Sequence, residues 1–498
     1  MEQINELAKF VTESRGKKIS LIDFESRDSK DNYRKIAERI GNGNITTESE
    51  ISQVIEVAEG SPGFRMFKSR FKEKLLNNVL LFDIKGEDRT PYHKAIMQCW
   101  RNVYCIKVLS ILGMINSAKG LAKSTYKKAI EFELYEVAFT CARELRRFGS
   151  YSGSEDKFNR YNQEAKESAR LNYAENMAFA CLESLYVKVA NTNFYKKELI
   201  GLAKEKLEEV TKIHEQSKTY LIGLFYYRVK VIYEELREDY AAALVTWGQF
   251  ENYIQGYKHF EYAIRIAEIA VQEFYCYMCL GDYVSAQKCS EKCELYYKRF
   301  SGNWYLYKEY YFLLAMHNKK YTQATSTVQQ IIAVPSFKFT QANRQEKWKL
   351  FEAYNYIMQR AVHEVDIDQN KAFNLAKFLN ETPIYNKDKG GFNISVLIVQ
   401  IMIFLLDKRF KELSEKFEAL KRYSSRNFQK DTEYKSRIFV KMIIMADKCA
   451  YDYDKTSKAT SKFYADLKKE PYRHSNSYEG LEIVPYAHLW EVVLDCLK

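Results

Sequence analysis

Residues that interrupt helices are scarce in this chain. It has 6 Pro and 19 Gly in 498 residues, against an average usage of about 5% and 7%. Because Pro and Gly form most tight turns, so low a content leaves few places where short strands could reverse direction. No alternation of apolar and polar residues bounded by turns persists anywhere. These absences exclude collagen-like, proline-rich and strand-rich proteins, and they predict an all-α fold.

Long apolar runs are also missing. The most apolar stretch, Ile394–Leu406, is interrupted by Ser395 and Gln400 and is shorter than the roughly 20 residues that cross a bilayer. We therefore expect a buried helix there and no membrane partner. Residues 1–18 contain no apolar core of the signal-peptide type, so a cytoplasmic location is expected.

A polybasic tail is absent although the chain is basic. Lys and Arg number 77 and Asp and Glu 65, which gives a net charge of +12. The excess lies in residues 101–150, 301–350 and 401–450, without a long run of basic residues. Scattered charge of this kind is typical of a solvated surface. Binding to an anionic partner would require the three blocks to converge in space.

The ten cysteines do not form a short disulfide framework. They fall within apolar helical patterns and are expected to be reduced, buried thiols of an intracellular protein. Four of them have the spacing of a zinc-binding quartet: Cys276, Cys279, Cys289 and Cys293. A hairpin turn near residues 281–282 would separate the second and the fourth by roughly 12–13 Å along the helices, too far for one tetrahedral ion. We therefore favour core positions for all four, with a zinc site as the alternative.

Motifs of catalytic sites are absent as well. His363 begins no His-Glu-x-x-His motif, because residue 367 is Ile. Tyr151 stands where a nucleophile elbow needs Ser, and Ala122 stands where a P-loop ending at Lys123 needs Gly. No pair of carboxylates stands apart as an acid–base couple. We expect no enzymatic activity and no cofactor, and the alternative is an enzyme that uses residues remote in sequence.

What the sequence does contain is a series of helix signals. Residues 2–14 have an amphipathic pattern, and Thr47 and Glu50 have the capping-box spacing ahead of an apolar helix. Pro62 opens a further helix, and Pro91 after Thr90 opens the next. Together these signals predict a small helical unit at the start of the chain.

The helix that begins at Pro62 has two contrasting faces. One is apolar and is expected to be a continuous core face: Phe64, Phe67, Phe71, Leu75, Val79 and Phe82. The other carries basic residues: Arg65, Lys68, Arg70, Lys72 and Lys74. This basic face is read first as a solvated surface. The alternatives are contact with an acidic protein or with nucleic acid, and least of all with a membrane surface.

A short pattern recurs along the chain: a turn, then Tyr, two variable residues and Ala. It occurs with its Tyr at four positions: Tyr126, Tyr240, Tyr283 and Tyr321. Degenerate copies lie around Ala372 and Leu413, so that the later copies recur about every 40 residues, one helical hairpin per repeat. The Tyr is expected to begin the second helix of each hairpin and to pack on the first, and the Ala to let the two backbones approach closely.

The sequence from Leu280 to Ala286, LGDYVSA, resembles the turn between the helices of the tetratricopeptide repeat (TPR) family, with Tyr277 at the earlier aromatic position. The copy at Tyr321 is followed by Pro335, close to where that family places its closing proline. The resemblance covers residues 230–420, although the repeats are longer than the family's roughly 34 residues. It implies an irregular TPR-like α-solenoid of antiparallel hairpins that binds protein segments on its concave face.

The predicted organisation has three parts: an N-terminal helical unit over residues 1–89, a TPR-like repeat array over 90–450 and C-terminal capping helices over 451–498. In the last part, an extended piece leads into Pro485 and a helix with Leu489 and Trp490. This segment is expected to seal the last repeat, because terminal repeats need caps. The alternative is an exposed docking tail.

The function predicted from these features is that of a non-catalytic adaptor or regulatory sensor that binds a protein segment. The expected contacts are Tyr277, Trp304, Lys308 and Tyr311, the last three of which are spaced to share one helix face. One alternative is a helical-repeat nucleic-acid binder that uses the basic face from Arg65 to Lys74 and the basic excess in 401–450. A weaker alternative, based on analogy alone, is an accessory subunit of a bacterial defence or toxin system. The oligomeric state stays open.

Overall fold

The fold was analysed in a computed structural model of the chain. It describes residues 32–41, 44–45, 47–80, 90–189, 196–334, 342–362, 392–409, 434–469 and 482–498, with the shorter pieces 337, 340, 378, 413, 416–418 and 420–422. The predicted helix over residues 2–14, the copy of the repeat at Ala372, and Phe82 and Pro335 lie outside the described residues.

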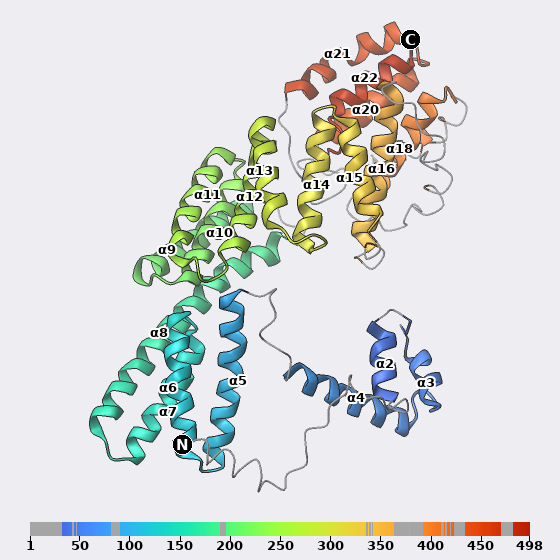
Figure 1. Ribbon diagram of the computed structural model, residues 1–498. Coiled ribbons are helices and arrows are strands. Elements are labelled where there is room, and N and C mark those ends of the chain that lie inside the picture. Colours follow the sequence, from blue (N-terminus) through green and yellow to red (C-terminus); the bar gives the residue numbers. More distant parts are fainter. Residues whose placement is uncertain are drawn as a thin grey trace. The chain divides into compact units, whose positions relative to one another are not determined.

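All regular secondary structure in these ranges is helical, as predicted from the scarcity of Pro and Gly (Figure 1). Contacts between residues divide the chain into two compact units. The three-part division at 89/90 and 450/451 stays a prediction.

Among its described residues, the first unit contains six complete helices: α2 (Asn32–Gly41), α3 (Glu48–Ile55), α4 (Pro62–Leu80), α5 (Pro91–Ile111), α6 (Ile115–Glu131) and α7 (Tyr135–Tyr151). Three helices contribute residues to both units: α8 (Glu155–Val189), α9 (Lys196–Gln216) and α10 (Tyr220–Leu236). Within the first unit, α5, α6 and α7 pack on one another.

The second unit begins with α11 (Tyr240–Ile254), the 3-10 turn η1 (Gln255–Tyr257, of which Tyr257 belongs to the first unit), α12 (Tyr262–Leu280), α13 (Tyr283–Tyr296), α14 (Gly302–His317) and α15 (Tyr321–Ile332). It continues with α16 (Ala342–Val362), α18 (Phe392–Leu406), α20 (Tyr434–Lys448), α21 (Tyr453–Lys469) and α22 (Tyr486–Cys496). Each helix from α11 to α16 packs on the next. One large core extends from α12 to α22 and includes Trp348 and Trp490.

The helix signals near the start of the chain are confirmed. Thr47 accepts a hydrogen bond from the Glu50 N–H (3.3 Å), and its own N–H donates to the Glu50 carboxylate (2.9 Å), a complete capping box. Helices α4 and α5 begin at Pro62 and Pro91, the latter capped by Thr90. The continuous core face expected on α4 is wrong for its second half: Phe64 and Phe71 are buried, but Val79 is 69% exposed.

The recurring Tyr is confirmed as the first residue of a helix at Tyr240, Tyr283 and Tyr321. A residue with positive φ follows the end of the preceding helix by one or two positions: Glu238 (φ 60°), Gly281 (φ 73°) and Lys319 (φ 58°), respectively.

The turn before Tyr283 shows how the chain reverses. The Gly281 N–H bonds to the Met278 carbonyl (3.1 Å) and the Asp282 N–H to the Tyr277 carbonyl (2.9 Å), the two bonds of a Schellman motif. Asp282 is at the same time the N-cap of α13, since its carboxylate accepts from the Ser285 N–H (3.0 Å). The end of one helix and the start of the next are therefore joined by two residues, Gly281 and Asp282.

The two side chains of the recurring pattern have separate roles. The Ala residues at 243, 286 and 324 are fully buried, as close helix packing requires. The Tyr240 ring lies against Tyr275 of α12 (centroids 5.8 Å apart), and Tyr283 lies against His317 of α14 (6.4 Å). These contacts run to the following helix, which the pattern did not predict.

One copy of the pattern was placed wrongly. Tyr126 lies inside α6, far from a turn. The equivalent turn comes at Glu133 (φ 52°), followed by Tyr135 as the first residue of α7 and by buried Ala138. Tyr135 and Ala138 have the same Tyr-x-x-Ala spacing as the other copies, so the sequence did carry a signal for this turn.

The predictions for the later helices are largely confirmed. The described side chains of α18 are buried on all sides as far as Leu405, as expected for Ile394–Leu406. Among the described residues, no helix combines the length and apolarity needed to cross a bilayer. Helix α22 packs on α18, α20 and α21 and buries Leu489 and Trp490. In the structure this segment is therefore packed into the core and is not an exposed tail.

Candidate functional site

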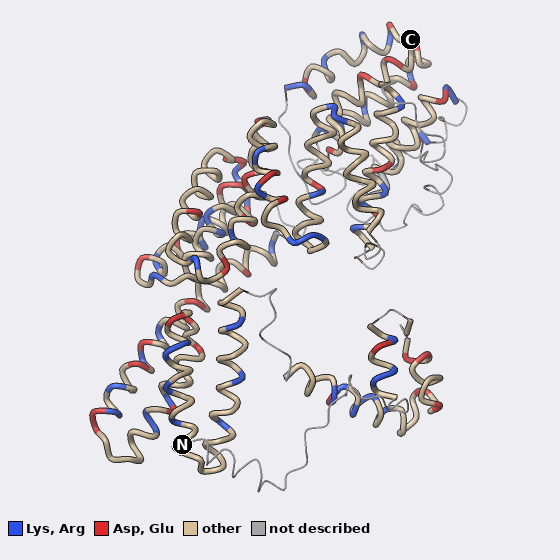
Figure 2. The backbone as a smooth tube through the Cα atoms, in the orientation of Figure 1, with Lys and Arg blue, Asp and Glu red and all other residues tan. Residues whose placement is uncertain are grey.

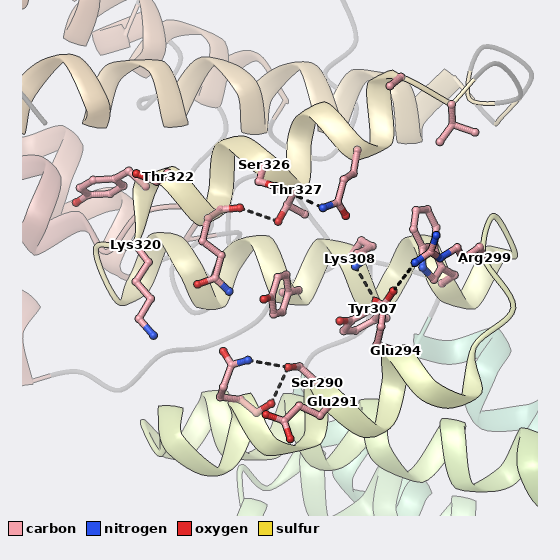
Figure 3. Close-up of a pocket in the computed structure, with 18 of the residues that line it drawn as sticks. Ser290, Glu291, Glu294, Arg299, Tyr307, Lys308, Lys320, Thr322, Ser326 and Thr327 are labelled. Atoms are coloured by element: carbon pink, nitrogen blue, oxygen red, sulfur yellow. Dashed lines mark hydrogen bonds and ion pairs between the residues drawn. The ribbon is translucent and has the colours of Figure 1, made fainter. Parts of the chain in front are cut away.

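The site that gathers most of the predicted contact residues is a groove in the second unit, with a volume of about 1270 Å³. Figure 3 shows α14 between α13 and α15 at this site. We call it the α13–α15 groove. Each helix contributes residues three or four positions apart, as one face of a helix must. These are Gln287, Ser290, Glu291 and Glu294 from α13; Trp304, Tyr307, Lys308 and Tyr311 from α14; and Thr322, Gln323, Ser326, Thr327 and Gln330 from α15.

Lys308 is the centre of the groove's floor. Its Nζ donates to the Glu294 Oε2 at 2.7 Å. The same Nζ lies 5.5 Å from the ring centroid of Trp304, 4.8 Å from that of Tyr307 and 5.4 Å from that of Tyr311. A cation surrounded by aromatic rings is stabilised by their π faces, and more strongly where water is excluded. The ammonium is therefore held by one carboxylate and three rings.

Glu294 links α13 to α14 through this ammonium. Burial acts to raise the pKa of Glu294, but the hydrogen bond and charge of Lys308 outweigh it and lower the pKa. Tyr307 also hydrogen-bonds to Glu294, and burial and this carboxylate raise the pKa of its phenol. The Arg299 guanidinium lies 3.7 Å away on the outer side. Glu294 is therefore ionised and fully engaged within the chain.

Three of the four predicted contact residues come together in the groove. Trp304, Lys308 and Tyr311 line one face of α14, as their spacing predicted. Tyr277 does not line the groove: it lies on α12, half-buried against the core. Contact of these residues with a partner stays a prediction.

Trp304 and Lys308 were expected to contact a partner directly, but the structure buries both side chains. Trp304 is only 3% exposed and Lys308 only 5%, so both shape the floor. Exposed side chains come from residues that were not among the predicted contacts: Glu291, Arg299, Phe300, Lys320, Thr322, Ser326 and Gln330. The four-residue spacing of the last three on α15 was a signal that could have identified them.

Figure 2 marks the basic positions along the backbone of α4, and the exposure of their side chains differs. Arg65, Arg70 and Lys72 are exposed. Lys68 instead pairs with Glu48 (2.8 Å) and lies over the Phe64 ring. Lys74 lies over the ring of Tyr33 (5.0 Å). The five residues predicted as one anionic-partner surface therefore reduce to three with exposed side chains.

The four clustered cysteines are buried free thiols: Cys276 and Cys279 on α12, and Cys289 and Cys293 on α13. Burial raises the pKa of the Cys289 thiol to about 12. In the described part of the chain, no group of three His, Cys, Asp or Glu side chains is placed to hold a metal. The core positions favoured for these residues are confirmed.

Comparison with known proteins gives no match: no family model, no curated protein and no solved structure matches the chain. The resemblance to the tetratricopeptide repeat therefore stays a prediction from the sequence.

Proposed function

We propose that this protein is a non-catalytic interaction module, a TPR-like α-solenoid that acts as an adaptor or regulatory sensor and receives a segment of another protein in the α13–α15 groove. The observation that carries the proposal is the convergence of three consecutive helix faces on one groove. The turns before α13 and α15 each reverse the chain within a few residues, which supports an arrangement of the helices in hairpins.

The size of the groove favours a polypeptide. Small-molecule sites usually enclose roughly 300–1,000 Å³, and this groove of about 1270 Å³ is larger. It runs along three helices, so an occupant would lie across several turns of helix. A peptide segment has the length to do so.

The chemistry of the groove fits a peptide backbone. Exposed Thr322, Ser326 and Gln330 form a row on α15, and hydroxyl and amide side chains can both donate and accept hydrogen bonds. Backbone N–H and C=O groups need both kinds of partner. The aromatic rings on α14 supply apolar contact area at the floor.

The test blocks the groove without disturbing the core. We would replace exposed Ser326 by Trp in the full chain, and use Gln329→Trp as control, since Gln329 is exposed on the same helix outside the groove. Affinity purification from the native host is expected to recover a protein partner with the wild type and with Q329W, and to lose it with S326W. Recovery of the same partners by all three proteins would contradict the proposal.

A second candidate function, nucleic-acid binding, is favoured by the exposed Arg65, Arg70 and Lys72 on α4. Phosphate contacts of this kind release counterions, so that binding weakens steeply with salt. An electrophoretic shift with single- and double-stranded RNA and DNA at low salt, abolished by replacing the three residues with Ser, is the expected result. No shift at low salt removes this candidate.

A further inference from the structure

A second cavity lies in the first unit, with a volume of about 320 Å³. It is lined by α5, by the turn at Glu133 and the start of α7, by the middle of α8 and by the first residues of α10. We call it the acidic-aromatic cavity. It contains carboxylates and rings together: Glu133, Glu136, Glu175, Tyr92, Trp100, Tyr135, Phe179 and Phe225.

No basic residue of the described chain lines this cavity beside its carboxylates. Burial raises the pKa of Glu133, and outside the lining the His259 imidazole acts on Glu133 to lower that pKa. Among the described residues that line it, none is Lys, Arg or His, although the chain carries a net charge of +12. Glu175 is 7% exposed and accepts one hydrogen bond, from the Thr219 hydroxyl at 2.8 Å. A buried carboxylate without a counter-charge costs folding free energy, which a bound cation would offset.

Glu133 is held in place by two features of its turn. Its backbone has a φ of 52°, a conformation that few residues other than Gly adopt without cost. Its carboxylate accepts the backbone N–H of Tyr220 at the start of α10. This contact fixes the Glu133 carboxylate at the cavity that Glu175 also lines, and it joins the turn to a helix far along the chain.

Two aromatic side chains of the cavity wall are exposed to solvent. Trp100 is 43% exposed and Phe179 is 40% exposed. Phe179 is held against the buried Phe225 ring, with centroids 4.9 Å apart. Large exposed rings beside buried carboxylates are the arrangement that binds organic cations, since the rings attract the charge and cover the alkyl part.

We propose that the acidic-aromatic cavity binds an organic cation, a primary ammonium on an alkyl chain, whose charge lies between Glu175 and Glu133 and whose chain lies against Trp100 and Phe179. The ammonium can come from a free alkylamine or from a lysine side chain of a peptide, because both present the same group. This site belongs to the first unit, and it is independent of the α13–α15 groove and of the function proposed for it.

The experiment is a calorimetric titration of the full chain at constant ionic strength and at about pH 9, where the Glu175 carboxyl, whose pKa burial raises to about 8, is ionised and an alkylammonium keeps its charge. The probes are n-butylammonium, a blocked pentapeptide with one central lysine, and n-butanol as the neutral analogue. We expect saturable binding of at least one ammonium probe and none of butanol. Binding of the peptide identifies a lysine side chain as a ligand, and binding of butylammonium alone identifies a free amine. Absence of binding by both ammonium probes would overturn the proposal.

Two variants, each with a matched control, place the binding in this cavity. Glu175→Gln keeps the shape and removes the charge, and is expected to weaken binding roughly tenfold or more. Its control is Glu234→Gln, because Glu234 is also buried and bonded to a threonine hydroxyl, Thr246 (3.0 Å), but lies outside the cavity. Trp100→Ala is likewise expected to weaken binding, and Tyr104→Ala, at an exposed site on the same helix, is not. Equal affinity of the wild type and E175Q would also overturn the proposal.

Discussion

The Nζ of Lys308 and the Oε2 of Glu294 lie 2.7 Å apart, and this ion pair joins α14 to α13 at the floor of the α13–α15 groove. Lys308 is almost completely buried, whereas Glu294 is partly open to solvent. The two partners are therefore unequal: loss of the carboxylate would leave a buried cation behind.

This inequality predicts the outcome of two substitutions. Glu294→Gln is expected to destabilise the fold by about 1 kcal/mol, a figure reduced from that of a fully buried pair because Glu294 is partly solvated. Adding Lys308→Met to it should recover part of that loss, because Met fills the same space among the rings without a charge. Thermal unfolding of the wild type, both single variants and the double variant measures the coupling. Additive losses in the double variant would show that the pair is not coupled.

A second prediction concerns two glycines with opposite roles. Gly281 has a φ of 73° in the turn before α13, so Gly281→Ala is expected to destabilise by about 1 kcal/mol although nothing lies near the added methyl group. Gly248 is in the interior of α11 and also has open space, and there Gly248→Ala should stabilise by about 0.5–1 kcal/mol. Denaturant unfolding of both variants is the measurement. The same sign for both would contradict the conformation assigned to Gly281.

A third prediction follows from the ionisation of Glu175. Burial, with repulsion from Glu133, raises the pKa of this carboxyl from 4.5 to about 8, against the Thr219 hydrogen bond that lowers it. The folded state thus binds the proton more tightly than the unfolded chain. The stabilisation it provides is complete below pH 4.5 and is lost as the pH rises toward 8.

Because Gln cannot ionise, Glu175→Gln should be increasingly more stable than the wild type between pH 5 and pH 8, by up to a few kcal/mol. The groups that face Glu175 are Glu133 from the turn before α7, Tyr92 from α5, Tyr135 from α7 and Thr219 ahead of α10. Unfolding measured across this pH range, with the exposed Glu136→Gln as control, tests the prediction. Parallel pH profiles for the wild type and E175Q would contradict it.

The sequence predicted those features that depend on neighbouring residues. Local hydrogen bonding and backbone preference explain the capping box at Thr47 and the helix starts at Pro62 and Pro91. They also explain the helix starts at Tyr240 and Tyr283. The buried helix α18 follows from its largely apolar composition. In each case the signal and the structure lie within a few residues of one another.

The features that sequence reasoning missed depend on distant residues. The Glu133 carboxylate accepts a hydrogen bond from the N–H of Tyr220, which lies 87 positions later. Lys308 was expected to face a partner, but Glu294 and the aromatic rings on its own helix enclose it. The second half of α4 has an apolar pattern, yet the Val79 side chain is largely exposed to solvent. Local patterns cannot show which of two apolar or charged faces a remote segment will cover.

The turns before α11, α13 and α15 reverse the chain by backbone hydrogen bonds within about six consecutive residues. Their geometry needs one residue that accepts a positive φ. It depends on almost no contact with other parts of the molecule. A pair of helices inserted or removed between two such turns would leave both turns intact. This architecture is therefore suited to changing length by whole helix pairs, and duplication or loss of such a pair would preserve the surrounding helices.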